Sequence, residues 1–401
     1  MKKSRPIDTT YVGVLDGVRA LGVLAVVWFH FWQQTWLRPV VKLPFTGWQM
    51  DLEWLPRSGY IMVDLLLVLS GFCLFLPVAR QMAQGQAGAG RFDVRGFYRR
   101  RAARILPSYY FCILLILFAV VLPAWPYTNM AEFWRDLLAS LTMTRTFFAE
   151  TFFFTKFNVV LWTVCIEVQF YLLFPLFARG FARRPVAFAA LMTGVSALGA
   201  ALLLAGVGDL RFWLNQLPLL LCDYAAGMLG AAAFVRLAAV GRRPLAVWGF
   251  SALAVGCIWG ILRIARLQAA AQELQSSQLV LRFPLSILFG CLLVALPLAA
   301  RPLRAVFDNR VMRFLAGISF NLYIWHQYLA VLLKKLHLPP WSGEVPPNQT
   351  GDLQWQHRYA LLIWAAAFAA ALFGTYVIER PLARLLRTKG AKPGPVITRA
   401  I

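Results

Sequence analysis

Charged residues are scarce in this sequence, and acidic ones are the scarcest. Only 14% of its 401 residues are charged, against about 25% in an average soluble domain. There are 17 Asp and Glu against 40 Lys and Arg, which gives a formal net charge of +23. A basic balance can indicate a nucleic-acid-binding protein, but 60% of the residues are apolar. Such a chain would expose large hydrophobic patches in water, so we predict a multi-spanning membrane protein that binds no nucleic acid.

Paired cysteines are also lacking. No CxxC pair occurs, and each of the six cysteines falls inside a long apolar run. Free cysteines in such runs behave as small buried apolar residues, whereas disulfide frameworks and metal sites have recognisable cysteine spacings that this sequence lacks. We therefore predict neither a disulfide nor a metal site.

Long apolar runs, in contrast, are abundant. A spanning helix needs about 20 predominantly apolar residues. Ten such runs occur, at 14–33, 59–79, 105–124, 159–178, 185–206, 214–234, 244–262, 283–300, 314–333 and 359–378. We predict an all-α, polytopic transmembrane bundle of about ten spanning helices. Residues 1–380 are expected to form a single transmembrane domain, and residues 381–401 a short basic cytoplasmic tail.

The segments that connect these runs differ in charge on the two sides of the membrane. If the N-terminus is cytoplasmic, Lys and Arg are about twice as frequent in the inner segments as in the outer ones. Cytoplasmic loops carry an excess of Lys and Arg. We therefore predict that both termini are cytoplasmic, which an even number of spans requires. Two of the longer outer segments are 125–158, with a helical pattern near 130–146, and 334–358.

Ionisable side chains inside the predicted spans are candidate functional residues, because each costs about 2.5–3.5 kcal/mol to insert. Five of them, from five different spans, are predicted to lie in the outer half of the membrane: His30, Asp64, Glu167, Asp223 and His326. A histidine can take a proton from a hydroxyl, and a carboxylate can orient it. The set predicts general acid–base chemistry. The alternative is a structural network of polar contacts that holds the helices together.

Arg19 lies eleven positions before His30 in the first predicted span. On one helix this spacing makes the two side chains face the same way, about 16 Å apart along the axis. Arg19 is expected near the inner end and His30 near the outer end. Asp16 is expected to cap this helix or to pair with Arg19.

A cluster of arginines precedes the third predicted span. The segment 97–110 reads FYRRRAARILPSYY, and we expect it to be an inner loop. Such charges fix topology and attract anionic lipid headgroups, but guanidinium groups also suit phosphate. The arginines at 99–104 are therefore candidate ligands of a cytosolic, phosphate-bearing donor.

Several segments together resemble the acyltransferase-3 family of membrane proteins. The resemblance is carried, in order, by LDGVRALGVLAVVWFH (15–30), VDLLLVLSGF (63–72), FYRRRAARILPSYY (97–110), LWTVCIEVQFYLLFP (161–175), ISFNLYIWHQYL (318–329) and IERP (378–381). Arg19 and His30 fall on the Arg-x10-His motif of this family. Cys165 is a departure, since the family more often has Ser there.

The resemblance implies transfer of an acyl group, usually acetyl, from cytosolic acyl-CoA to a hydroxyl. The acceptor would be a glycan or a lipid-linked saccharide, with no metal involved, and the enzyme would lie in the inner membrane in contact with lipid. The implied catalytic residues are His30, Asp64, Glu167 and His326. The implied ligands of acetyl-CoA, or of another acyl-CoA, are Arg19, Arg100, Arg101 and Arg104. His30 would act as the base or carry the acyl group.

Many relatives in the family fuse a soluble SGNH esterase-like domain after the last span. Only about 20 residues follow Ile378 here, so we expect no such domain, and transfer would be direct or through a separate periplasmic partner. Three alternatives stay open. They are a transporter or exporter of a lipid-linked sugar or small molecule, an acyltransferase for a small-molecule or lipid acceptor, and a structural or sensor membrane protein.

Overall fold

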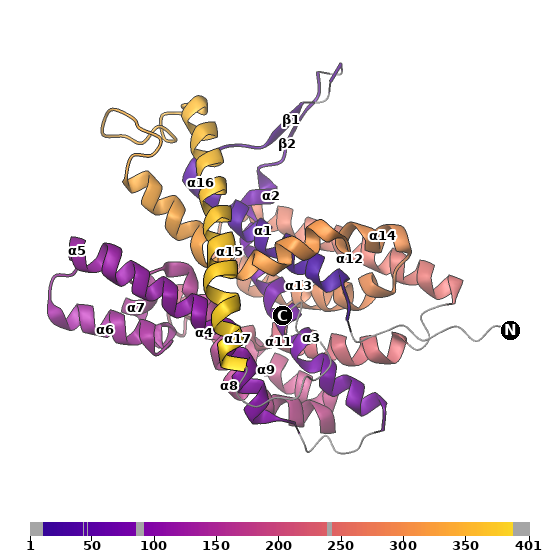
Figure 1. The fold of residues 1–401 in the computed structure, drawn as a ribbon. Coiled ribbons are helices and arrows are strands. Elements are labelled where there is room, and N and C mark those ends of the chain that lie inside the picture. The colour runs from indigo at the N-terminus through magenta and orange to yellow at the C-terminus, as the bar shows by residue number, and fades with distance from the viewer. Residues whose placement is uncertain (1–10, 43, 46, 86–91, 239–242, 388–401) are drawn as a thin grey trace.

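Helices form almost all of the secondary structure. The computed structural model describes residues 11–42, 44–45, 47–85, 92–238 and 243–387. The long helices are α1 (Val14–Thr35), α3 (Met62–Ala83), α4 (Val94–Ile116), α8 (Trp162–Arg183), α9 (Pro185–Leu204), α11 (Leu217–Ala238), α12 (Pro244–Ala270), α13 (Leu274–Leu298), α15 (Arg310–Lys335) and α16 (Leu353–Phe373). They pack into one bundle (Figure 1).

Shorter elements connect the long helices. They are α2 (Trp54–Arg57), α5 (Leu122–Ala124), α6 (Met130–Leu141), α7 (Ala149–Phe153), α10 (Leu210–Trp213), α14 (Arg301–Phe307) and α17 (Arg380–Arg387). The strands β1 (Val40–Lys42) and β2 (Gln49–Asp51) pair antiparallel, with Val40 opposite Asp51. This hairpin projects from the bundle (Figure 1). The helix predicted in the outer segment 125–158 is α6.

The predicted all-α polytopic bundle is confirmed. Within the described residues, nine helical segments are long and apolar enough to cross a membrane. The remaining predicted span, 314–333, corresponds to α15, which is 26 residues long and more polar, because it carries Asn321 and His326 and has basic residues at both ends. Its length still suffices for a span, since about 20 residues cross the hydrocarbon core.

The prediction of an inner loop at 97–110 is wrong, because these residues lie inside α4. The helix begins at Val94, where the carboxylate of Asp93 accepts a hydrogen bond of 2.8 Å from the backbone N–H of Gly96. An N-cap of this kind starts a helix wherever the capping side chain stands, even outside the apolar run. The arginines therefore occupy fixed positions on a helix.

The gap left between the predicted spans 244–262 and 283–300 is largely helical. Helix α12 continues to Ala270 and α13 begins at Leu274. Arg282 consequently lies inside α13, and its side chain is buried. The prediction placed Arg282 outside the span because a charged residue lowers the local hydropathy.

The centre of the bundle is the close contact between α3 and α11. A Cβ atom added to Gly227 would lie 2.0 Å from the backbone oxygen of Val68, and one added to Gly71 would lie 2.6 Å from that of Tyr224. Small residues let helix backbones approach closely in membranes. Around this pair, α1 packs against α3 and α15, and α13 packs against α11 and α12. The helices that carry the predicted site residues thus surround one core.

Candidate active site

The five predicted outer-half residues separate into three groups. His30 of α1 contacts His326 of α15. Asp64 of α3 and Asp223 of α11 share a buried arginine. Glu167 of α8 lines a cavity. The sequence predicted only a shared depth for these five residues, and the neighbouring helices decide which of their side chains meet.

The two histidines form a directed hydrogen-bonded pair. Nε2 of His326 lies 2.9 Å from Nδ1 of His30, and Nδ1 of His326 lies 2.7 Å from the backbone oxygen of Tyr323. A carbonyl oxygen only accepts, so Nδ1 of His326 must donate, and in the neutral ring its Nε2 accepts from His30. The N–H of His30 is then on Nδ1, which also lies 3.1 Å from the oxygen of Val26. This leaves Nε2 of His30 with a free lone pair, as a base or nucleophile requires.

Aromatic rings surround this pair. The ring of Phe29 contacts His30 at a centroid distance of 4.9 Å, and that of Tyr323 lies 5.5 Å from His326. His326 is fully buried, while His30 is partly exposed. His30 is therefore the more accessible member of the pair, and His326 contacts it from the buried side.

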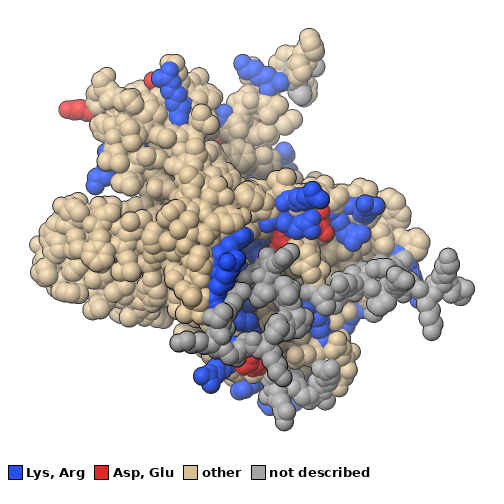
Figure 2. All heavy atoms as spheres, viewed as in Figure 1, with Lys and Arg blue, Asp and Glu red and all other residues tan. Residues whose placement is uncertain are grey.

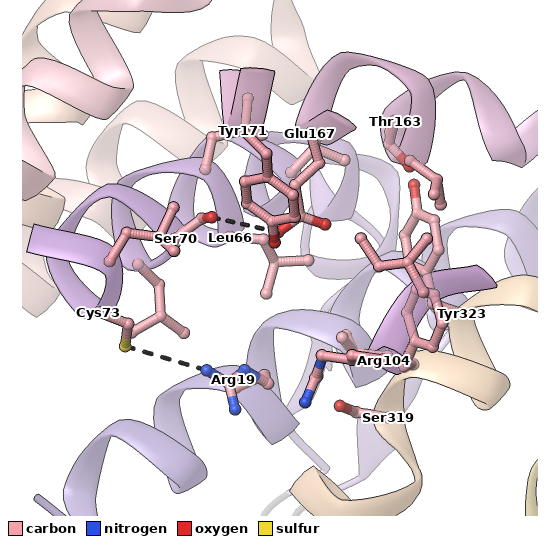
Figure 3. Close-up of a pocket in the computed structure, with 18 residues that line it drawn as sticks. Arg19, Leu66, Ser70, Cys73, Arg104, Thr163, Glu167, Tyr171, Ser319 and Tyr323 are labelled. Atoms are coloured by element: carbon pink, nitrogen blue, oxygen red, sulfur yellow. Dashed lines mark hydrogen bonds between the residues drawn. The ribbon is translucent and has the colours of Figure 1, made fainter. Parts of the chain in front are cut away.

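A cavity of about 120 Å³ lies in the bundle between five helices (Figure 3). Its polar lining residues are Arg19 of α1, Ser70 of α3, Arg104 of α4, Thr163, Glu167 and Tyr171 of α8, and Ser319 and Tyr323 of α15. Figure 3 shows Arg19 and Arg104 on one side of this space and Glu167 on the other. The Tyr323 side chain lines the cavity and its backbone oxygen holds His326, so the cavity and the histidine pair are adjacent.

Glu167 is held by hydroxyl groups. Its Oε1 accepts a hydrogen bond of 3.1 Å from Ser70 and another from the hydroxyl of Tyr171. Arg19 lies 3.8 Å from the carboxylate of Asp16, as the sequence suggested, and its Nη2 lies 4.0 Å from Sγ of Cys73. The cavity thus presents guanidinium groups at one side and a hydrogen-bonded carboxylate at the other.

The four predicted CoA ligands do not lie together. Arg19 and Arg104 line the cavity. The guanidinium of Arg101 lies 5.5 Å from the ring centre of Tyr171, at the cavity wall. Arg100 instead pairs with Asp93 at 3.6 Å, with about half of its side chain exposed. Arg100 and Arg104 are four residues apart and face nearly the same way on α4, so the division follows from position along the helix: Arg100 lies one turn closer to the N-terminus, where Asp93 is the N-cap.

The aspartates meet around Arg282, which the sequence reasoning missed as a site residue. Nε of Arg282 lies 3.4 Å from Asp64 and 3.9 Å from Asp223, and all three side chains are at most 3% exposed. Nη1 of Arg282 donates to the backbone oxygen of Leu214 at 2.7 Å, and the hydroxyl of Ser286 donates to Asp223. Asp64 is therefore directed to an ion pair between α3, α11 and α13. The Tyr323 carbonyl and His326 orient His30 in place of a carboxylate.

Segment 125–158 contacts α15, the helix of His326, and its buried Arg145 was likewise missed as a site residue. Arg145 is fully buried and donates to the backbone oxygen of Asn158 at 2.6 Å. The amide of Asn158 donates to the backbone oxygen of Ile324, two residues before His326, at 2.5 Å. The signal in the sequence was a lone arginine among aromatic residues. Among the described residues, no three His, Cys, Asp or Glu side chains gather as metal ligands would.

Fold and site together define a polytopic membrane protein with a hydrogen-bonded histidine pair beside an arginine-lined cavity. Residues 12–380 match the family described as an acyltransferase domain, Acyl_transf_3. The chain therefore belongs to this acyltransferase family, and the resemblance drawn from its sequence motifs is confirmed.

Two relatives are O-acetyltransferases by name. The peptidoglycan O-acetyltransferase OatA of Listeria monocytogenes is 26% identical over 192 residues, which are 46% of this chain and 26% of that protein. The O-acetyltransferase OatA of Staphylococcus aureus is 26% identical over 174 residues, which are 41% of this chain and 24% of that protein. The matched segment thus spans about a quarter of either relative. No solved structure matches the chain.

Proposed function

We propose that this chain is a membrane O-acyltransferase that moves an acyl group, most simply acetyl, from cytosolic acyl-CoA to a hydroxyl of an extracytoplasmic or lipid-linked glycan. The observation that carries the proposal is the His30–His326 pair beside a cavity lined by Arg19 and Arg104. The names of the relatives, both O-acetyltransferases and one acting on peptidoglycan, support acetyl as the group and a glycan as the acceptor.

The donor side of the proposal rests on charge. Lys and Arg gather over the region of α14 and α17, whereas the lobe of α5 and α6 shows none in this view (Figures 1 and 2). Helix α17 packs against α4, which carries Arg101 and Arg104. The cavity of about 120 Å³ is lined by Arg19 and Arg104, and guanidinium groups suit a phosphate-bearing donor.

In the proposed reaction His30 acts as the general base. Its Nε2 takes the proton of the acceptor hydroxyl while the hydroxyl oxygen attacks the thioester carbonyl. The C–S bond breaks, and the thiolate of CoA leaves with the proton that His30 had taken. The hydrogen bond from Nδ1 of His30 to His326 keeps the ring in the required tautomer and disperses the charge that forms on it.

A variant of this route uses His30 as an acyl carrier. Nε2 attacks the thioester carbonyl, the thiolate leaves, and Nδ1 passes its proton to Nε2 of His326. The acceptor hydroxyl then takes the acyl group from the imidazole, its proton passes through Nε2 of His30 to the CoA thiolate, and His326 returns its proton to Nδ1 of His30. Covalent relay of this kind splits one difficult transfer into two easier steps. Glu167, held by Ser70 and Tyr171, would position the substrates on the far side of the cavity.

The replacement His30→Ala tests both routes. General-base catalysis contributes about 10²–10⁴-fold, so we expect a loss of this size in the transfer of label from acetyl-CoA to isolated cell-envelope glycan, followed by mass spectrometry. Binding of acetyl-CoA and thermal unfolding check that the variant is folded. A folded variant that binds acetyl-CoA and acylates the glycan at the normal rate would contradict the proposal.

We further propose that the chain lies in the inner membrane with both termini in the cytoplasm, and that residues 1–380 act as one domain with a basic tail at 381–401. The excess of basic residues in the predicted inner segments supports this orientation. Reporter fusions at each terminus test it, because a reporter active only in the periplasm should stay silent at both ends.

A further inference from the structure

The end of α1 beyond His30 forms a second cleft, distinct from the arginine-lined cavity. Its lining residues are Trp32, Gln33, Trp36, Arg38 and Glu53. The carboxylate of Glu53 organises it, accepting hydrogen bonds from Nε1 of Trp32 at 3.3 Å and from Nε of Arg38 at 2.9 Å. Nη2 of Arg38 donates to Asp51 at 3.0 Å. The polar groups of this cleft are thus held in place before any ligand arrives.

Trp36 stands in an unusual backbone conformation at the edge of the cleft. Its φ is 57° and its ψ is 17°, and its backbone N–H donates to the oxygen of Trp32 to end α1. This left-handed position at a helix end is usually taken by Gly or Asn, and a bulky residue there is an outlier. The indole is nevertheless 51% exposed. A strained position that displays an aromatic ring to the outside indicates a role for the ring itself.

The cleft lies within reach of His30. Gln33 follows His30 by three residues and so lies on the same face of α1. Trp36 follows by six, which places it about 9 Å farther along the helix axis and about 120° around it. A short oligosaccharide spans this distance, so one ring can occupy the cleft while the next presents a hydroxyl to Nε2 of His30.

The charges of the cleft distinguish between ligand classes. Arg38 is paired with both Asp51 and Glu53, so its positive charge is more than balanced. A phosphate or a polyanionic ligand would meet these two carboxylates and be repelled. An uncharged ligand with an apolar face and a rim of hydroxyls fits better. The flat indole matches the C–H face of a sugar ring, and amide, guanidinium and carboxylate groups match its hydroxyls.

We propose that this cleft is the acceptor subsite, which binds a saccharide ring of the glycan through Trp36, Gln33, Arg38 and Glu53. The proposal rests on the function proposed above and adds to it where the acceptor lies. It predicts that damage to the cleft weakens use of the glycan and leaves use of acetyl-CoA intact.

The replacement Trp36→Gly tests the subsite, because Gly adopts the left-handed conformation without strain and only the indole is lost. The assay is transfer of label from acetyl-CoA to isolated envelope glycan. We expect the KM for glycan to rise about tenfold, because one aromatic contact is lost. The KM for acetyl-CoA should stay at the wild-type value. The matched control is Trp125→Gly, since Trp125 also ends a helix in the left-handed region, at φ 37°, and is no part of the cleft lining.

A second variant covers the case in which Trp36→Gly does not fold. Gln33 is exposed on α1, so Gln33→Ala keeps the helix, and we expect the KM for glycan to rise about threefold for one lost hydrogen bond. Wild-type values of this KM in the folded variants, or an equal rise in Trp125→Gly, would overturn the subsite and leave the enzyme activity standing. Absence of any transfer by the wild-type protein would overturn the proposed function, and the subsite with it.

Discussion

Two groups of charged side chains lie inside this bundle, and they are built in opposite ways. Around Arg282, two carboxylates from two other helices contact one guanidinium, and all three side chains are sealed from solvent. Around the cavity, Arg19 and Arg104 come from two helices and face the same open space, while Glu167 is hydrogen-bonded by hydroxyls. The members of the first group contact one another, whereas those of the second line a cavity.

We propose that this contrast separates structural from functional charge inside the bundle. A buried ion pair that contacts only its own members joins helices, and its loss should reduce stability. Charged groups that border a cavity can change partners when a substrate arrives, and their loss should reduce binding or turnover. The cost of inserting a charge into the membrane is similar for the two groups, so only the contacts of each side chain distinguish them.

The largest effect within this comparison is expected from Arg282→Met. The replacement leaves Asp64 and Asp223 buried without their cation, and removing one partner of a buried pair costs about 3–5 kcal/mol. We expect a marked fall in the midpoint of thermal unfolding of the purified protein in detergent.

The matched control is the triple variant with Asp64→Asn, Asp223→Asn and Arg282→Met. Because it removes every charge of the cluster, most of the lost stability should return. If Arg282→Met instead kept the wild-type midpoint and lost binding of acetyl-CoA, the cluster would belong to the functional site and the contrast drawn here would fail.

The sequence predicted the apolar parts of the helices well and their polar ends poorly. Apolar runs located the spans, and the start of α1 at Val14 and of α9 at Pro185 agree with them. Hydropathy misplaced the start of α4, because the Asp93 cap and the arginines after it are polar, and it left Arg282 outside α13 for the same reason. Where a helix continues through polar residues, it extends beyond its apolar run, so hydropathy does not locate that helix end.

The site itself was predicted only in part. The Arg-x10-His spacing placed Arg19 and His30 on one face of a helix, and the depth of His326 was compatible with contact. His326 contacts His30, and Asp64 contacts Arg282, because of which helices are neighbours. Helix packing, such as the approach of α3 to α11 at Gly227, determines the neighbours. A single sequence carries depth and direction along each helix but little about its partners.

The next effect concerns His326, which acts on the reaction through His30. The replacement His326→Leu removes the acceptor for Nδ1–H of His30, so we expect kcat to fall about 100-fold, the lower end of general-base contributions. The KM values for both substrates should change little, because His326 is buried and reaches neither. Steady-state kinetics with labelled acetyl-CoA measures this division.

The conservative variant His326→Gln tests whether His326 positions His30 or only fills space. In His326→Gln the amide oxygen can accept from His30 as Nε2 does, so we expect this variant to keep clearly more activity than His326→Leu. Equal activity of the two variants would show that the contact between the histidines serves packing alone.

The smallest effect compares two arginines one turn apart on α4. Arg104 lines the cavity and Arg100 pairs with Asp93 at the surface, yet each replacement by Ala removes one positive charge from the same helix. For Arg104→Ala we expect the Kd for acetyl-CoA to rise about tenfold, since hydrogen bonds to charged groups contribute about 1.5–3 kcal/mol. For Arg100→Ala it should change by about twofold or less, because an exposed ion pair contributes about 0–1 kcal/mol. Measuring the Kd for acetyl-CoA at low and high salt distinguishes direct contact from long-range electrostatic attraction. Equal losses of affinity in both variants that vanish in high salt would mean that the arginines act only through their summed electrostatic field. The position of Arg104 in the cavity would then not matter for binding.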